Sequence, residues 1–250
     1  MRKKILFGNW KMNNILTKAK IFVKDIPYMC ELAKKKNLDL GVAPSYLCIS
    51  YLVENRHDFL IYAQEVHTCL KGAFTGDISI PQIKDFGVQG SLVGHSERRA
   101  YHHETNQDCN LKIQLLIEHD MGAIYCVGET LSEYESKKAF DVIKKQIYEG
   151  LRNISSDDLK HVIIAYEPVW SIGTGKNAST DIAETMCKYI RSLIAEMFTQ
   201  EDANEIRILY GGSVKPDNIH QYLLQPDVDG ALVGGASLEA NSFISLIENC

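Results

Sequence analysis

Residues 162–176 read VIIAYEPVWSIGTGK and combine a strand pattern with a polar loop. The first five residues are apolar and rich in β-branched side chains, which is typical of a parallel strand covered on both faces. Glu167 follows this run directly, before Pro168 and a segment that contains Gly173 and Gly175. Because a parallel strand needs neighbours of the same kind, the fold depends on how often the pattern recurs.

Seven further apolar runs have strand length, and the first residues of all eight are about 32 positions apart, the length of a strand plus a crossover helix. No linker rich in proline, glycine or serine divides the chain. The pattern favours a single-domain (β/α)8 barrel over residues 1–250, with an open doubly wound sheet as the alternative. The other runs are ILFG from Ile5, LDLGVA from Leu38, FLIYA from Phe59, SLVG from Ser91, AIYCV from Ala123, IRILY from Ile206 and GALVG from Gly230.

The segment TDIAETMCKYIRSLIAEMF, residues 180–198, has the period of an amphipathic helix. In a barrel, such helices form an outer ring and pack one face against the strands. The residues expected on that face are Ile182, Met186, Tyr189, Ile190, Leu193 and Met197.

The composition limits the possible partners and compartments. A net charge of −5 gives no sign of a nucleic-acid surface. The seven cysteines show neither CxxC spacing nor a matching histidine pattern for zinc, which favours reduced thiols in a cytosol-like compartment. The apolar run near the N-terminus is too short to span a membrane. We therefore expect a soluble, cytoplasmic protein.

The barrel hypothesis turns the strand runs into a site prediction, because all strands of a parallel barrel end at one rim. Acids, bases and glycines are concentrated at these ends. The rim positions are Asn9, Lys11, Pro44, Gln64, His95, Cys126, Glu129, Glu167, Gly211, Gly212, Gly234 and Gly235.

Two glycine pairs end the last two runs, in YGGSV at 210–214 and LVGGAS at 232–237. Either pair alone is typical of a tight turn. Together, at the positions where barrels commonly bind phosphate, they favour backbone N–H groups that hold a phosphate dianion. The motif GTGKNA at 173–178 resembles a dinucleotide loop, but it does not open a helix directly after a strand.

Four polar residues at the rim are candidates for chemistry. Lys11 would be a solvated charge in isolation, and Asn9 a turn residue; beside a phosphate site they form an electrostatic clamp and a hydrogen-bond donor. His95 is a structural histidine in the simplest interpretation. However, N–H groups of a helix beginning at Ser96 could keep its ring neutral, as an electrophile that polarises a carbonyl. Glu167 is either a helix-end charge or a general base, which an apolar lid would strengthen.

The chain resembles the triosephosphate isomerase family in GNWKMN, AQE, GAFTGD, GHSERR, CVGETL, AYEPVWSIGTGK, YGGSV and LVGGASL. The resemblance implies proton transfer between C1 and C2 of dihydroxyacetone phosphate by Glu167, without metal or cofactor. His95 would shuttle protons between the two oxygens with help from Asn9, and Lys11 would stabilise the negative charge.

The resemblance also implies supporting roles. Backbone N–H groups of Gly173, Ser213, Gly234 and Gly235 would bind the phosphate. Glu97 would lie behind Lys11, Glu129 would hold Trp170 while the lid is open, and Ile172 and Leu232 would close over the carboxylate. The remaining alternatives are a phosphate-binding barrel without catalysis and an isomerase for a larger sugar phosphate.

A homodimer is implied as well, in which the GAFTGD loop enters the partner subunit and Thr75 approaches its Asn9 and Lys11. Met12 and Arg98 belong to the same expected interface. Asp77 stands where a Glu is expected to pair with Arg98, and Glu65 stands where a neutral amide is expected. We expect burial to raise the pKa of Glu65 and leave it without a partner; the alternative is that Glu65 reaches water or pairs with a lysine.

Overall fold

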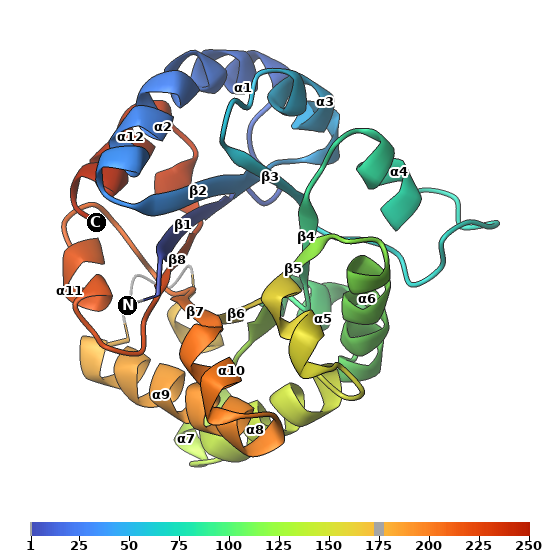
Figure 1. Cartoon of the computed structure of the whole chain (residues 1–250), viewed down its shortest axis with the longest axis vertical. Helices are drawn as coiled ribbons and strands as arrows, with labels where there is room; N and C mark the ends of the chain where they lie inside the picture. Colours follow the sequence, from blue (N-terminus) through green and yellow to red (C-terminus); the bar gives the residue numbers. More distant parts are fainter. Residues whose placement is uncertain (1, 173–177) are drawn as a thin grey trace.

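The computed structural model describes residues 2–172 and 178–250, and its centre is a closed barrel of eight parallel strands (Figure 1). Each strand pairs with the next in sequence, and β8 pairs with β1, which places Leu6 opposite Ala231. This closure confirms the predicted barrel and excludes the open sheet. The strands are β1 (Lys4–Asn9), β2 (Leu38–Ala43), β3 (Leu60–Ala63), β4 (Gly90–Val93), β5 (Gly122–Val127), β6 (Val162–Tyr166), β7 (Arg207–Tyr210) and β8 (Gly230–Val233).

The strands are buried on both faces and build two apolar layers. Ile5 and Phe7 belong to a cluster inside the barrel, whereas Leu6 between them belongs to the larger cluster beneath the helices. Double burial explains why the strand runs are continuously apolar rather than alternating. Because side chains fill the barrel, its interior has no room for a ligand, and a ligand bound by several strands must lie at their ends.

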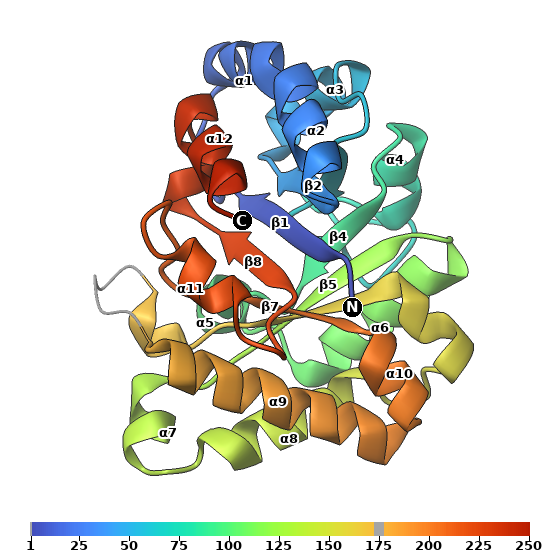
Figure 2. The same cartoon turned by 60° about the vertical axis from the view of Figure 1, so that its left-hand side comes forward.

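The helices surround the barrel (Figure 2). Short 3₁₀ turns also occur, and η3 (Val169–Ser171) and η4 (Gly235–Ser237) lie directly after β6 and β8. The α-helices are α1 (Leu16–Phe22), α2 (Ile26–Lys35), α3 (Tyr46–Glu54), α4 (Ile80–Asp85), α5 (Ser96–His102), α6 (Asn106–Glu118), α7 (Leu131–Glu135), α8 (Ala139–Gly150), α9 (Thr180–Met197), α10 (Gln200–Glu205), α11 (Ile219–Leu223) and α12 (Ala240–Glu248).

Helix α9 confirms the predicted helix, and all six residues expected on its inner face are buried or packed against the core. The buried face extends further than predicted and includes a charged residue. Ser179 caps it by accepting a hydrogen bond from the N–H of Ile182 at 3.3 Å. Ile182 and Tyr189 are only half-buried, whereas Arg191 is buried and forms ion pairs of 2.6 Å with both Asp227 and Asp229. The apolar period alone could not show this, because the two acids lie in the loop before β8.

The loop between β3 and α4, residues 64–79, projects away from the barrel (Figure 1). It contains the GAFTGD motif, and Thr75 is exposed on it. Among the helices of residues 2–172 and 178–250, none is long and apolar enough to cross a membrane.

Candidate active site

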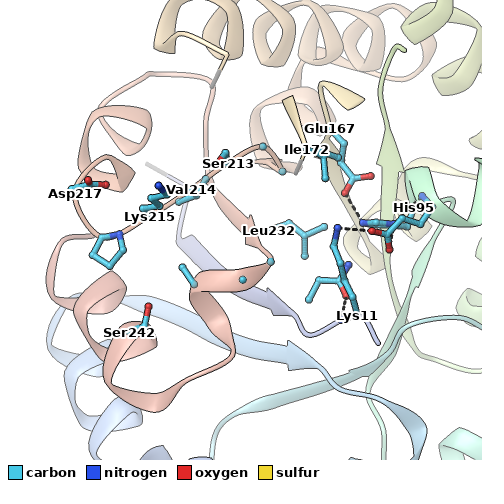
Figure 3. A pocket seen from close by; sticks show the side chains of 18 residues that line it. Lys11, His95, Glu167, Ile172, Ser213, Val214, Lys215, Asp217, Leu232 and Ser242 are labelled. Carbon is cyan, nitrogen blue, oxygen red and sulfur yellow. Dashed lines mark hydrogen bonds and ion pairs between the residues drawn. The ribbon is translucent and has the colours of Figure 1, made fainter. Parts of the chain in front are cut away.

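A cavity of about 870 Å³ opens at the carboxyl ends of the strands, and Figure 3 shows the side chains of Lys11, His95 and Glu167 converging on one side of it. The residues singled out from the sequence that line it are Asn9, Lys11, His95, Glu97, Glu167, Ile172, Gly211, Gly212, Ser213, Leu232, Gly234 and Gly235. Val214, Lys215, Pro216, Asp217, Ala236 and Ser242 complete the lining.

Lys11 is held in an unusual backbone conformation. Its φ of 51° lies in the left-handed region, which non-glycine residues seldom adopt. Two contacts support this geometry: its N–H donates to Oδ1 of Asn9 at 3.0 Å, and Nε2 of Gln64 donates to its carbonyl at 2.8 Å. Its Nζ donates to Oε1 of Glu97 at 2.8 Å. The ammonium group is thereby fixed at the cavity wall.

His95 lies at the start of α5, as predicted from the residues after it. The N–H of Glu97 donates to Nδ1 at 3.2 Å, so the neutral ring carries its proton on Nε2. Nε2 lies 3.1 Å from Oε1 of Glu167. Burial alone would lower the pKa of His95, but the charge of Glu167, the hydrogen bond to it and the charge of Glu97 together outweigh burial and raise the pKa. This direction is opposite to the one expected for a neutral electrophile, and it results from Glu167 resting against the ring.

Glu167 is almost fully buried, with 3% of its surface exposed. Its Oε2 accepts a hydrogen bond from the N–H of Ser96 at 3.1 Å. Burial alone would raise the pKa of Glu167, but His95 and the Ser96 N–H outweigh it and lower the pKa. In this arrangement the carboxylate is a weak base. It becomes a stronger one only by leaving these partners, because their loss removes what stabilises its charged form.

Gly211 leaves the space in which the Glu167 side chain lies. A Cβ atom at position 211 would be 2.8 Å from Cγ of Glu167. The glycine pair after β7 was predicted to bind phosphate, but its first residue also makes room for the carboxylate of Glu167.

The other glycine pair and Ser213 form the far end of the cavity. Gly235 begins the turn η4, where the first N–H groups have no acceptor within the turn. Within the described part of the chain, the N–H groups of Ser213 and Gly235 donate no hydrogen bond. These donors suit an anion. Gly173, predicted to contribute another, lies outside the described residues.

The segment after Glu167 is anchored at both described ends. Nε1 of Trp170 donates to Oε1 of Glu129 at 2.7 Å, and the Trp170 ring packs against Tyr134 with centroids 4.7 Å apart. On the other side, Oη of Tyr222 donates to the carbonyl of Ala178 at 2.6 Å. The Glu129 contact is the one implied by the resemblance. Tyr222 was missed, because it lies in α11 rather than at a strand end.

Glu65 is not left without a partner, so that expectation is wrong. Its Oε2 lies 3.1 Å from Nε of Arg98, and its Oε1 accepts a hydrogen bond from Nζ of Lys112. Lys112 also donates to Glu104 at 2.7 Å. Asp77 lies 3.8 Å from Nε2 of His67 instead. The carboxylate next to Arg98 is therefore that of Glu65 and not that of Asp77.

The pKa of Glu65 is raised to about 7, in the predicted direction. Burial is the main cause and the neighbouring charge of Glu104 the second; Lys112 and Arg98 only partly oppose them. Burial alone would lower the pKa of Lys112, but its two carboxylate neighbours outweigh burial and raise it.

The rim of this barrel brings together a buried carboxylate, an imidazole, a lysine and backbone N–H groups that suit an anion. These groups define an enzyme for acid–base chemistry on a small anionic substrate. The family model for triosephosphate isomerase matches residues 4–250. Proteins named triosephosphate isomerase from Mycoplasma mobile and Streptococcus pyogenes are 47% and 41% identical to this chain. The alignments cover 99% of this chain in both cases, and 100% and 98% of those proteins. The chain belongs to the triosephosphate isomerase family.

Proposed function

We propose that this protein interconverts dihydroxyacetone phosphate and D-glyceraldehyde 3-phosphate in glycolysis and gluconeogenesis. The observation that carries the proposal is the contact of Glu167 with His95, beside Lys11, in one cavity. A carboxylate can remove a proton from carbon, and an imidazole N–H can donate to the oxygen on which charge develops. Family membership gives the substrate class.

The reaction begins when substrate displaces Glu167 from Ser96 and His95. The carboxylate takes a proton from C1, and the electrons of that C–H bond form the C1–C2 double bond of an enediolate. Nε2 of His95 supplies a proton to O2, and the ring recovers one from O1. Glu167 then returns its proton to C2, which gives the aldehyde. Asn9 assists at the oxygens, and Lys11 stabilises the enediolate charge.

The phosphate binds at the opposite end of the cavity. Backbone N–H groups of Ser213, Gly234, Gly235 and Gly173 donate to its oxygens, and Lys11 adds a positive charge. Ile172 and Leu232 cover Glu167 when substrate is bound. Exclusion of water then raises the pKa of the carboxylate and makes it a stronger base. Glu97 orients Lys11 throughout.

Displacement of Glu167 also explains how His95 can be neutral during the reaction. The carboxylate that lies against the ring is the main reason why the pKa of His95 is raised. Once Glu167 has moved to the substrate, the N–H of Glu97 on Nδ1 favours the neutral ring with its proton on Nε2.

We propose further that the active form is a cytoplasmic homodimer. Large apolar side chains are exposed around the projecting β3–α4 loop and the nearby rim: 98% of Met12, 90% of Leu47, 42% of Phe74 and 75% of Tyr101. Exposed apolar surface of this kind favours association. Thr75 on the loop then approaches the partner's site, and Glu65, Asp77 and Arg98 lie at the edge of the contact. The free cysteines suit a reducing compartment.

A coupled assay with purified protein and dihydroxyacetone phosphate, in the presence of a chelator, tests the activity. We expect full turnover with chelator, because the proposed steps use only organic groups. No turnover would favour a phosphate-binding barrel without catalysis. Faster turnover of a larger sugar phosphate would show that this sugar phosphate, and not dihydroxyacetone phosphate, is the substrate. A strict metal requirement would contradict the mechanism.

A further inference from the structure

A second cavity, of about 210 Å³, lies outside the active site, between β6 and the helices α7, α8 and α9. Figure 2 shows these three helices side by side. It is smaller than the pockets that hold drug-sized ligands, which measure roughly 300–1,000 Å³. Its size therefore limits a ligand to about one ring with a short side chain. The lining residues are Glu129, Tyr134, Ala139, Phe140, Tyr166, Asp181, Ile182, Thr185 and Met186.

Most of this lining is apolar or aromatic. Tyr134 and Phe140 are 39% and 45% exposed, although both are large rings. Phe140 packs edge-on against Tyr189, with centroids 4.7 Å apart. Met186 is buried among the apolar residues of α9. Such walls favour a flat aromatic ligand, which can stack on the rings and cover them from water.

Glu129 is the acid of this cavity that is fully buried, with 0% of its surface exposed. Both hydrogen bonds to its carboxylate end on Oε1, from Oη of Tyr166 at 3.1 Å and from Nε1 of Trp170 at 2.7 Å. In the parts of the chain that the structure describes, Oε2 has no hydrogen-bond partner. Buried acceptors almost always have one, so a ligand that donates a hydrogen bond matches the site.

The charge of the cavity points to a cationic donor. Among the described residues of the lining, Glu129 and Asp181 are the two carboxylic acids, and none is basic. Asp181 is exposed at the start of α9. An ammonium group would be attracted by both carboxylates and could donate to the unpaired oxygen of Glu129.

We propose that this cavity is a binding site for a small arylalkylamine, with the ring between Tyr134, Phe140 and Met186 and the ammonium group on Glu129. The ligand would touch Tyr134 and Glu129, the two side chains that hold Trp170. It would therefore bind at the start of the segment that follows Glu167, without occupying the substrate cavity.

The test uses 2-phenylethylamine and the full chain, with binding measured by ligand-observed NMR and by tryptophan fluorescence. We expect saturable binding with one site and a Kd on the order of 1 mM, as suits a ligand of nine non-hydrogen atoms. The neutral analogue 2-phenylethanol should bind at least tenfold more weakly.

Three variants locate the site. Thr185→Phe fills the cavity from α9 and should abolish binding, while isomerase kinetics stay unchanged. Lys188→Phe adds the same ring at an exposed position of α9 outside the lining and should bind the amine normally. Glu129→Gln keeps the shape but not the charge, and should weaken the amine about tenfold without affecting the alcohol. Absence of saturation, normal binding by Thr185→Phe, or equal affinity of Glu129→Gln for the amine would each overturn the proposal.

Discussion

At the scale of single residues, the position of Glu167 decides the chemistry. The carboxylate rests on the Ser96 N–H and on His95, which makes it a weak base in the free protein. Its strength in catalysis then depends on a short movement to the substrate. Small changes in the reach of this side chain, or in the space around it, should therefore have large effects.

Glu167→Asp withdraws the carboxylate by one methylene group. A misplacement of about 1 Å can cost on the order of 10²-fold in rate, so kcat should fall by about that factor while KM changes much less. Steady-state assays in both directions measure the effect. A variant with near-normal kcat would contradict the role of Glu167 as the base.

Gly211→Ala tests the space that Glu167 needs. The new Cβ atom would lie 2.8 Å from Cγ of Glu167, which is too close for a fixed neighbour. We expect kcat to fall at least tenfold with little change in the melting temperature, because the clash is with a side chain that can move. Equal activity of this variant and the parent would show that Glu167 does not need this space.

At the scale of elements, the strands were predictable and the helix faces less so. Each strand is a continuous apolar run because both of its faces are buried. Since all strands of a parallel barrel end at one rim, Asn9, His95 and Glu167 could then be placed there. By contrast, the buried Arg191 and the anchor Tyr222 depend on contacts between segments far apart in sequence. No local pattern marks them. For the same reason, a lysine partner of Glu65 was only the alternative, and the sequence could not identify it as Lys112.

Tyr222→Phe tests the anchor after the segment that follows Glu167. The variant removes the hydroxyl that donates to the buried carbonyl of Ala178, so closure over the enediolate should become less complete. An enediolate exposed to water expels phosphate and forms methylglyoxal. We expect lower kcat and more methylglyoxal per turnover.

Tyr148→Phe is the control for this experiment, since Tyr148 lies on α8 away from the cavity. It should leave the product ratio unchanged. An unchanged ratio in Tyr222→Phe as well would mean that this anchor does not protect the intermediate.

At the scale of the whole molecule, the exposed apolar rim and the charged cluster beside it should control association and stability. Thr75→Arg places a long cation on the tip of the projecting loop. If the loop enters a partner subunit, the variant should shift the protein from dimer to monomer in sedimentation velocity experiments and reduce kcat. Ser192→Arg, at an exposed position of α9, is the matched charge control. A parent protein that sediments as a monomer would remove the dimer proposal.

Glu65→Gln tests the charged cluster through the pH dependence of stability. A carboxyl whose pKa is raised to about 7 on folding contributes most favourably below its unfolded pKa of about 4.5. That contribution is lost as the pH rises through about 7. Glutamine does not titrate, so the variant should gain melting temperature relative to the parent as the pH rises from 5 to 8. A constant difference between the two proteins would contradict the raised pKa.

The pairing of Arg98 with Glu65 instead of residue 77 also constrains how this surface can evolve. Lengthening Asp77 to Glu first would gather three carboxylates around Arg98 and Lys112, and the added repulsion would disfavour that intermediate. If Glu65 changes to an amide first, Lys112 keeps its ion pair with Glu104. Arg98 loses its carboxylate partner, but its side chain is 32% exposed and its guanidinium still reaches water. We therefore expect the exchange to cost less stability when position 65 changes before position 77 than in the reverse order.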